Sequence, residues 1–530
     1  MKKIIMRNIR APIYDTHQAA VSAATDVLMK EGVRFTNITL CKKSLDARRK
    51  NDIHYLCSVI VSCEKLPNEK KLKYLDAVVL KEEEVTPVFG DRIATSPHVV
   101  VGFGPCGMFT ALLLAENGYR PVVIERGGDV ASRKKAVESF YNTRVLDLSS
   151  NIQFGAGGAG TFSDGKLLTR VNDPRCSYVL KRLVEFGAPE DITVNAKPHI
   201  GTDILERIVE NIAERIISLG GEIHYNTRMT AIKTDSCGRA VAVVTDKSEI
   251  SCETLTLAIG HSSRDTYGYL IKNSFAVVPK SFSVGVRVEH LQSEISYALY
   301  GDKASELPPG EYSLSKREGS RGVYSFCMCP GGEVVAAASE EGQVVTNGMS
   351  RRARDLENAN SAIAVSVDPT DYGSSAEGAI EFQRELEKKA FVMAGSNYNA
   401  PLQTMGDFMK GECKSEPTKV RSSYMGGDHF TVCDLNKLLP PFVSQMLKVG
   451  FDDFGRRIRG FDADYALLTG VESRTSSPVR IMRGEDMTAT GHPNIYPCGE
   501  GAGYAGGITS AALDGISCSF EIMKKYRRPE

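Results

Sequence analysis

One segment near residue 100 constrains the fold more than any other part of this chain. Residues 98–127, HVVVGFGPCGMFTALLLAENGYRPVVIERG, begin as a β-branched strand, turn through three glycines, continue as an apolar helix and end as a second strand. Gly102, Gly104 and Gly107 have G-x-G-x-x-G spacing, which permits a tight turn, close approach of a pyrophosphate, and close packing of helix on strand. The segment therefore predicts a dinucleotide-binding βαβ unit with the helix N-terminus at the pyrophosphate.

The acid that ends the second strand narrows the choice of ligand. Glu125 lies 23 residues after Gly102, where a carboxylate accepts hydrogen bonds from the adenosine ribose hydroxyls. Because an acid there disfavours a 2′-phosphate, the pattern predicts FAD or NAD rather than NADP. Pro105 and Arg126, which flank the turn and the acid, complete the candidate cofactor-binding residues of this segment.

The far end of the chain distinguishes FAD from NAD. Residues 494–516, NIYPCGEGAGYAGGITSAALDGI, comprise a strand, an acid, a glycine-rich turn and a new helix. This run resembles the C-terminal FAD motif of flavoproteins with the glutathione-reductase-type fold. The resemblance implies that Gly499 and Glu500 lie at the ribityl and phosphate region. It also implies that the helix from Gly507 and Ile508 directs its dipole at the flavin N1 and O2 edge. That family more often has Asp where this chain has Glu500.

Three intervening segments resemble further parts of such an FAD site. GAGGAGTFSDGKL, residues 155–167, resembles the loop beneath the isoalloxazine ring, and a mobile glycine loop is the alternative. GGEIHYNTRMTAI resembles the strand whose backbone binds adenine, and TLTLAIGHSSRDT resembles the apolar strand that ends in a glycine near the cofactor. The contacts that the resemblance implies are Gly157, Gly158, Thr161, Ser163, Met229 and Gly260.

Taken in order, these segments resemble a bacterial family of uncharacterised FAD-dependent dehydrogenases. YSFCMCPGGEVVAAASE, from Tyr324, and TNGMSRRARDLENANSA, from Thr346, are similar to that family's insertion. Geranylgeranyl reductases and aromatic hydroxylases are wider relatives. The resemblance implies an α/β fold: a Rossmann-like FAD-binding domain of glutathione-reductase type, an inserted β-rich α+β substrate domain and a small N-terminal α/β module.

The predicted domain boundaries follow from changes in the pattern along the chain. The N-terminal module and its connector take residues 1–92, and the first part of the FAD-binding domain takes 93–279. The inserted substrate domain takes 280–487. The C-terminal part of the FAD-binding domain, 488–530, returns to the glycine-rich style of the first part.

Hydropathy and turn residues predict the local elements. In the first module we expect a strand over 4–9, a helix from Asp15 or Thr16 to Gly32, and strands over 33–40 and 53–61. KKSLDARRK between the last two is predicted as a basic hairpin tip, and the charge-rich residues 64–92 as a connector. Beyond the module, a helix is expected over 204–219. The insertion is expected to hold long strands with one charged helix around 380–393.

Two cysteines of the insertion are candidate catalytic residues. In YSFCMCPGG the strand period of two places Cys327 and Cys329 on one face. The stretch is similar to the strand that roofs the substrate in geranylgeranyl reductases, which implies that these thiols face the flavin. Thiols at i and i+2 of a strand sit near the limit of disulfide geometry. Three interpretations of these cysteines therefore remain open: they line the cavity without redox chemistry, they are buried in the core, or one is a catalytic thiol.

His261 is the third candidate catalytic residue. It follows the last cofactor strand, and it is either a proton donor to reduced flavin or substrate, or a hydrogen-bonded structural histidine. Aromatic hydroxylases carry an acid near here, but this chain has Ile259, which argues against hydroxylation. Other polar residues near the predicted site are expected to fix loops or to form ion pairs: Asp164, Lys166, Arg287 and Arg384.

The spacing of fingerprints predicts the type of enzyme. Between residues 130 and 490 the G-x-G-x-x-G spacing recurs only in GAGGAG at 155–160, inside the glycine-rich loop. No second fingerprint that follows a predicted strand occurs there, where two-domain pyridine-nucleotide reductases carry one. We therefore expect an FAD-dependent oxidoreductase that transfers hydride between flavin N5 and a small-molecule substrate held between the insertion and the flavin. NAD(P)H would then be a transient reductant, or an electron-donor protein would replace it. A fold that holds FAD without turnover is the alternative.

Composition excludes several other classes. The chain has 65 basic and 65 acidic residues, so its net charge is zero, and 13 cysteines without zinc spacing. These features predict a cytoplasmic protein with reduced thiols, no structural metal and no membrane segment. The rival function is RNA modification or RNA contact, in which Arg48, Arg49 and Lys50 dock nucleic acid. Zero net charge argues against that partner.

Overall fold

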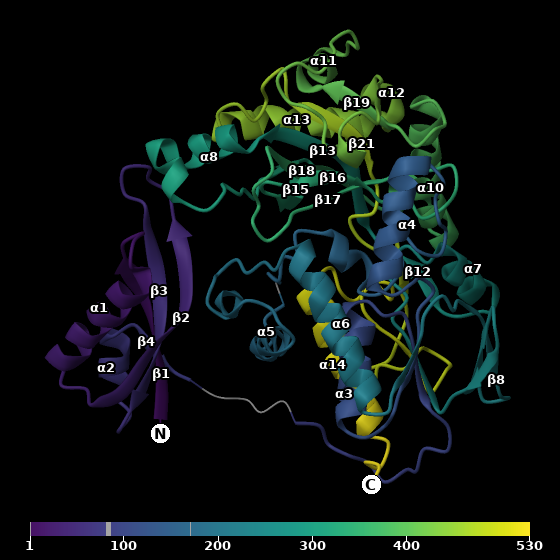
Figure 1. Ribbon diagram of the computed structural model, residues 1–530, viewed down its shortest axis with the longest axis horizontal. Coiled ribbons are helices and arrows are strands. Elements are labelled where there is room, and N and C mark those ends of the chain that lie inside the picture. Colours follow the sequence, from purple (N-terminus) through teal and green to yellow (C-terminus); the bar gives the residue numbers. More distant parts are fainter. Residues whose placement is uncertain (1, 81–85, 170) are drawn as a thin grey trace.

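The computed structural model describes residues 2–80, 86–169 and 171–530. Its first part is a four-stranded antiparallel sheet in the order β2-β3-β1-β4, and it stands beside the rest of the molecule in Figure 1. Helix α1 buries Ala20, Ala24 and Leu28, which recur at helical spacing. The elements are β1 (Lys2–Ala11), α1 (Thr16–Lys30), β2 (Phe35–Asp46), β3 (His54–Cys63), α2 (Glu69–Tyr74) and β4 (Ala77–Val79).

Two predictions for this module are wrong in detail. Strand β2 continues to Asp46, so half of the predicted basic tip lies in the sheet, where β2 pairs with β3 beyond a register shift after Leu40. The predicted connector contains α2 and β4, because Leu75 and Ala77 complete the core beneath β1. Residues 81–85 of that connector lie outside the described residues.

The FAD-binding domain predicted from the sequence is built on a parallel five-stranded sheet in the order β23-β11-β5-β6-β7. Its strands are short and fully buried at the centre, as is typical of a sheet covered on both faces. The C-terminal strand pairs with β11, which also pairs with the first strand of the fingerprint. The strands are β5 (His98–Val101), β6 (Val122–Ile124), β7 (Glu222–His224), β11 (Thr254–Leu257) and β23 (Ile495–Pro497).

Alternate residues of this sheet face two different layers. Val100 and Val123 pack against three helices, α3 (Pro105–Glu116), α6 (Thr202–Ser218) and α14 (Ile508–Met523). Val99 and Val101 face a three-stranded sheet and α7 (Arg264–Lys272) on the other side. That small sheet consists of β8 (Met229–Thr234), β9 (Ala240–Thr245) and β10 (Glu249–Ser251). This layering confirms the predicted α/β Rossmann-like fold with β-rich regions.

The inserted region is organised by a seven-stranded sheet in the order β14-β15-β18-β13-β21-β19-β20. It lies above the parallel sheet in the view of Figure 1. A two-stranded ribbon, β12 with β22, joins the two regions, and β16 pairs with β17 as a separate hairpin. The strands are β12 (Val277–Pro279), β13 (Phe282–Leu291), β14 (Ser315–Glu318), β15 (Arg321–Cys329), β16 (Glu333–Ala336), β17 (Thr346–Met349), β18 (Asn358–Val367), β19 (Ala400–Thr404), β20 (Phe430–Val432), β21 (Leu467–Glu472) and β22 (Val479–Ile481).

The insertion contains more helix than the sequence predicts. The expected charged helix is present as α10 (Ala376–Met393), but α13 (Pro441–Arg457) is nearly as long and packs Val443, Leu447 and Phe454 into the same core. Its apolar residues are mixed with glycine and charges, which hides the helical period. The other helices of the chain are α4 (Val130–Thr143), α5 (Cys176–Glu185), α8 (Gln292–Tyr300), α9 (Pro369–Tyr372), α11 (Met405–Lys410) and α12 (Leu435–Leu438), with short 3₁₀ helices η1 (Gly158–Phe162), η2 (Glu190–Thr193), η3 (Gly301–Glu306) and η4 (Tyr424–Gly426).

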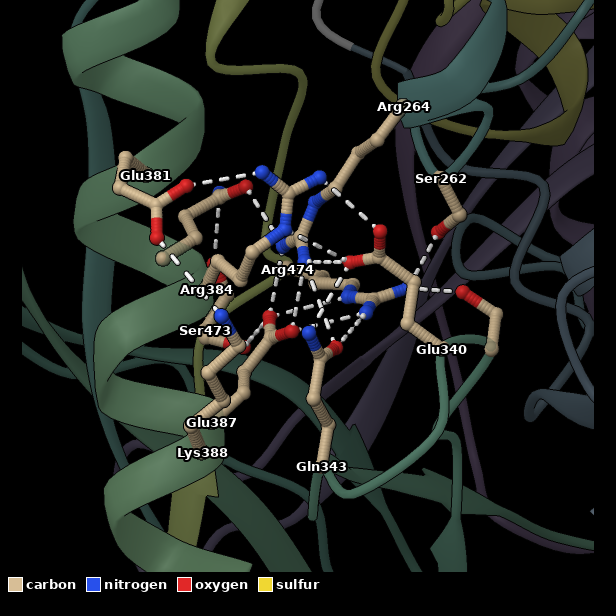
Figure 2. Close-up of polar contacts among 12 residues, drawn as sticks. Ser262, Arg264, Glu340, Gln343, Glu381, Arg384, Glu387, Lys388, Ser473 and Arg474 are labelled. Carbon is tan, nitrogen blue, oxygen red and sulfur yellow. Dashed lines mark hydrogen bonds and ion pairs between the residues drawn. The ribbon is translucent and has the colours of Figure 1, made fainter.

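A buried network of charges fixes the insertion to the FAD-binding domain (Figure 2). Glu387 on α10 accepts hydrogen bonds from Arg264 at 2.7 and 2.8 Å and from Arg474 at 2.8 and 3.0 Å. Ser473 Oγ donates to the same carboxylate at 2.6 Å. Burial alone would raise the pKa of Glu387, but the two guanidinium groups hold it well below its usual range. Since α7 supplies Arg264, the carboxylate joins two regions of the fold.

Replacing Glu387 tests how much the fold depends on this network. We expect Glu387→Gln to lower the free energy of unfolding by about 3 kcal/mol, because Arg474 would stay buried without its carboxylate partner and Arg264 would keep only Glu340, which it shares with Arg384. Chemical denaturation measures the change, with Glu385→Gln, at an exposed position of the same helix, as the matched control. Equal stability of the two variants would contradict this role.

Candidate functional site

One cavity lies where the sheet of the FAD-binding domain meets the insertion. It has a volume of about 330 Å³, and its walls come from the fingerprint, the glycine-rich loop, the C-terminal motif and the insertion. The predicted site residues that line it are Gly102, Gly104, Pro105, Glu125, Arg126, Gly158, Ser163, Met229, Gly260, His261, Cys327, Gly499, Glu500, Gly507 and Ile508.

The remaining predicted residues lie behind this wall. Gly107 is in α3, and a Cβ there would sit 2.0 Å from the Gly102 carbonyl oxygen, so glycine is required for the turn to pack. Thr161 is buried and donates to the Gly158 carbonyl at 2.9 Å. Gly157, with a φ of 86°, and the fully buried Cys329 are likewise outside the cavity lining. These four residues support the site without forming its surface.

The Glu125 carboxylate ties two loops together at the end of β6. It accepts hydrogen bonds from the backbone N–H groups of Phe103 at 2.8 Å, Gly127 at 2.9 Å and Gly155 at 2.9 Å. A carboxylate offers about four lone-pair positions, so one remains for a ligand in the cavity that Glu125 lines. The ribose contact stays a prediction, and the structure adds a second role for this acid as the clamp between the fingerprint and the glycine-rich loop.

The glycine-rich loop is held by an arginine that the sequence analysis missed. Arg133 on α4 is buried and donates to the carbonyl groups of Asn151, Ile152 and Ala156 at 2.7 to 2.8 Å. It also donates to Thr161 Oγ1 at 2.7 Å. Satisfied carbonyls of this kind fix a loop, which argues against a mobile segment. Nothing in the local sequence marks Arg133, since its partners are the carbonyl groups and one threonine hydroxyl of a loop elsewhere in the chain.

The C-terminal motif is positioned by contacts with the fingerprint helix. A Cβ at Gly515 would lie 2.3 Å from the Cys106 carbonyl oxygen, so α14 crosses α3 at very close range. Asp514, paired with Arg483, accepts from the Gly499 backbone N–H at 2.7 Å. Thr509 Oγ1 donates to the Leu167 carbonyl at 2.7 Å and so fastens α14 to the glycine-rich loop. The fingerprint near residue 100 and the motif near residue 500 therefore form one site.

Two helix N-termini border the cavity, and both are free of acidic side chains. Gly104 and Pro105 begin α3, Gly507 and Ile508 begin α14, and all four line the cavity. Neither first turn contains Asp or Glu. The partial positive charge of each terminus is therefore available to an anionic ligand.

The glycines of the cavity wall leave room for a ligand at the backbone. A Cβ at Gly506 or Gly507 would meet no protein atom within 4 Å, and one at Gly104 would meet only Gly158 Cα at 3.7 Å. Packing against other protein atoms therefore does not explain why these positions are glycine. Together with the two helix N-termini, this open backbone fits the pyrophosphate and ring of an FAD molecule.

The insertion supplies the opposite wall of the cavity, with Phe326, Cys327, Asn347, Arg474 and Thr475 among its residues. The regular alternation predicted for Cys327 and Cys329 is wrong. The pairing of β15 with β18 shifts register between Phe326 and Cys329, and Cys327 has a φ of 43°. This bulge leaves Cys327 at the cavity and Cys329 fully buried.

Polar contacts settle the state of His261. Ser262 Oγ donates to Gln153 Oε1 at 3.0 Å and lies 3.1 Å from His261 Nδ1. Because the Ser262 proton is used, Nδ1 is the donor in that contact and Nε2 carries the lone pair. Burial, reinforced by Arg474 and Arg264, lowers the pKa of His261 to about 3. The imidazole is neutral near pH 7, which favours the structural alternative.

Glu500 has the opposite behaviour. Its Oε1 lies 4.0 Å from His261 Nε2. Burial raises the pKa of Glu500 to about 7, although Lys280 pulls it down. Glu500 can therefore hold or release a proton near neutral pH beside the cavity.

The other polar residues named from the sequence form ion pairs. Asp164 bonds Lys166 at 2.7 Å and also pairs with Arg354, Arg287 pairs with Glu472 at 3.0 Å, and Arg384 pairs with Glu340 at 2.9 Å. All thirteen cysteines are free thiols. Across the described ranges 2–80, 86–169 and 171–530, no helix is both long and apolar enough to cross a bilayer.

Several solved structures superpose loosely on this chain. Glycine oxidase from Bacillus cereus has 9% identity and a TM-score of 0.36, and the match covers 81% of this chain and 95% of that one. A mutant of the quinol fumarate reductase of E. coli has 11% identity and a TM-score of 0.37, with 82% and 70% covered. The flavin-dependent halogenase CmlS has 12% identity and a TM-score of 0.38, with 82% and 59% covered.

Sequence comparison identifies the family. A protein from Clostridium beijerinckii described as uncharacterized is 46% identical over 506 residues, which cover 93% of this chain and 94% of that protein. The family model described as "FAD-dependent protein, C-terminal domain-like" matches residues 281–475, the region of the seven-stranded sheet. The chain therefore belongs to the same family as this Clostridium protein, and its inserted region matches the C-terminal domain of FAD-dependent proteins.

Proposed function

We propose that this protein is an FAD-dependent oxidoreductase that acts on a small molecule held between the cofactor and the inserted sheet. The observation that carries the proposal is the single cavity to which both ends of the chain and the insertion contribute. Two helix N-termini without acids and an open glycine backbone at its wall fit one long dinucleotide. When bound, FAD supplies two-electron chemistry.

The chain's own residues have separate tasks in this proposal. Gly104 and Gly158 give the pyrophosphate access to the backbone, and Glu125 accepts from the ribose. Phe326, Asn347 and Thr475 form the wall against which a substrate lies. Glu500, with its raised pKa, holds the proton that a two-electron reaction must take up or release.

Gly104→Ala tests the cofactor assignment without disturbing the fold. The new methyl group would meet only Gly158 Cα at 3.7 Å, in ordinary contact, but it would project where the cofactor must approach. We expect FAD affinity to fall at least about tenfold, that is about 1.4 kcal/mol, with unchanged thermal unfolding of the apoprotein. Titration of apoprotein with FAD, followed by flavin fluorescence, measures both variants.

The control for this experiment is Gly268→Ala, an exposed position of α7 where a Cβ meets no atom within 4 Å. It should bind FAD as the wild type does. Wild-type protein that takes up no flavin, or that releases FMN on denaturation, would contradict the assignment, and so would equal FAD affinity of the two alanine variants.

The pH dependence of stability tests the state of Glu500. Its pKa is about 7 in the folded protein and about 4.5 in the unfolded chain. The folded state therefore binds the extra proton between these values, and stability is lost as pH rises through them. Between pH 5.5 and 8.5 the wild-type apoprotein should lose about 2 kcal/mol more than Glu500→Gln. Denaturation at both pH values measures this, and parallel losses would show that Glu500 titrates normally.

A further inference from the structure

Two thiols meet at the cavity wall of the insertion. Cys327 lines the cavity and Cys329 is fully buried next to it, and their sulfur atoms are 4.0 Å apart. The bulge at the end of β15 produces this approach, because Cys327 has a left-handed φ of 43°. A non-glycine residue in that region costs about 1 kcal/mol or more, and such strain is concentrated at functional sites.

Two cations lie against the same turn of backbone. Arg287, buried on β13, donates from Nη1 to the Cys327 carbonyl at 3.2 Å, and its counter-charge is Glu472. Lys166 donates to the Met328 carbonyl between the two cysteines, and its counter-charge is Asp164. Lys166 comes from the glycine-rich loop, so both halves of the cavity contribute a charge beside the thiols.

These surroundings shift the pKa values of the two thiols in opposite directions. The contact with the Cys329 thiol, together with Arg287 and Lys166, lowers the pKa of Cys327 against the effect of burial. The same contact and burial raise the pKa of Cys329. These opposite shifts favour a thiolate at Cys327 and a thiol at Cys329, and a thiolate beside a thiol is the reactive form of a dithiol.

We propose that Cys327 and Cys329 form a dithiol–disulfide couple that exchanges two electrons with the bound cofactor. This inference rests on the proposed FAD function and adds a second redox centre to the same cavity. On oxidation, the S–H bond of Cys329 breaks and a bond forms between the two sulfur atoms. The pair then gives two electrons and one proton to oxidised FAD, and disulfide reduction is the reverse. Bonding requires the sulfur atoms to close from 4.0 Å to about 2 Å, a side-chain rotation.

A second pair of neighbouring thiols provides an internal comparison. Cys106 and Cys498 also line the cavity, and their sulfur atoms are only 3.1 Å apart. Burial raises the pKa of Cys106, and its hydrogen bond to Cys498 raises that of Cys498, so both remain protonated thiols. A short distance between two sulfur atoms therefore does not by itself identify a redox pair. The feature that distinguishes Cys327 is the pair of cations, Arg287 and Lys166, beside it.

Electron counting on the holoprotein tests the proposal. Oxidised wild-type holoprotein, titrated anaerobically with dithionite, should accept about four electrons per FAD, two for the flavin and two for the disulfide. Cys327→Ser and Cys329→Ala should accept about two. Cys237→Ala, at an exposed position outside the cavity lining, should accept as many as the wild type. The flavin absorbance of each variant shows that it is folded. If Cys329→Ala does not bind FAD, the result for Cys327→Ser decides, because Cys327 is only partly buried and serine is close to cysteine in size.

Alkylation gives a readout that is independent of the flavin. When the oxidised holoprotein is denatured without reductant in the presence of an alkylating reagent, Cys327 and Cys329 should remain unlabelled. When it is reduced before denaturation both should be labelled, and peptide mass spectrometry measures this. Wild-type holoprotein that binds FAD but accepts only two electrons overturns the dithiol couple and leaves the proposed function intact. A disulfide mapped to Cys106 and Cys498 also overturns it. Protein that binds no FAD overturns the proposed function instead.

Discussion

The whole structure depends on how closely the backbone of three segments can approach at the centre of the FAD-binding domain. A side chain at Gly102 would strike the Ala258 carbonyl, one at Gly107 the Gly102 carbonyl, and one at Gly515 the Cys106 carbonyl, all within 2.3 Å. At these contacts α3 and α14 pack closely against each other and against β5 and β11. Because α3 and α14 belong to opposite ends of the sequence, the cavity exists only when the chain has closed on itself.

The insertion is held against this centre by charge as well as by apolar contact. Glu387 on α10 pairs with two buried arginines, one from each region, and Glu340 supplies a second carboxylate to Arg264. Arg474 also donates to Ser262 at 3.1 Å and lines the cavity. Removing a buried partner leaves an uncompensated charge, which is costly. The arrangement therefore links the position of the inserted sheet to the groups that surround His261.

The sequence predicts the parts of the site that depend on local backbone. Gly102, Gly104 and Gly107 act within one turn, so their spacing alone identifies the fingerprint, and Glu125 follows at the end of the next strand. Residues whose role depends on distant partners are not predictable in this way. Arg133 is identified only by the carbonyl groups of another loop. The bulge at Cys327 depends on pairing with β18, where Cys329 lies opposite Asn360. The sequence of β15 alone therefore does not predict it.

Amide hydrogen exchange tests most directly whether the two ends of the chain hold one cofactor. With FAD, exchange at residues 102–107 and at residues 499–508 should slow together relative to the apoprotein. ADP, which has the adenosine and the diphosphate but lacks the ribityl chain and the flavin ring, should slow the first segment much more than the second. Protection by FAD of one segment without the other would contradict the account, since each segment would then serve a different ligand.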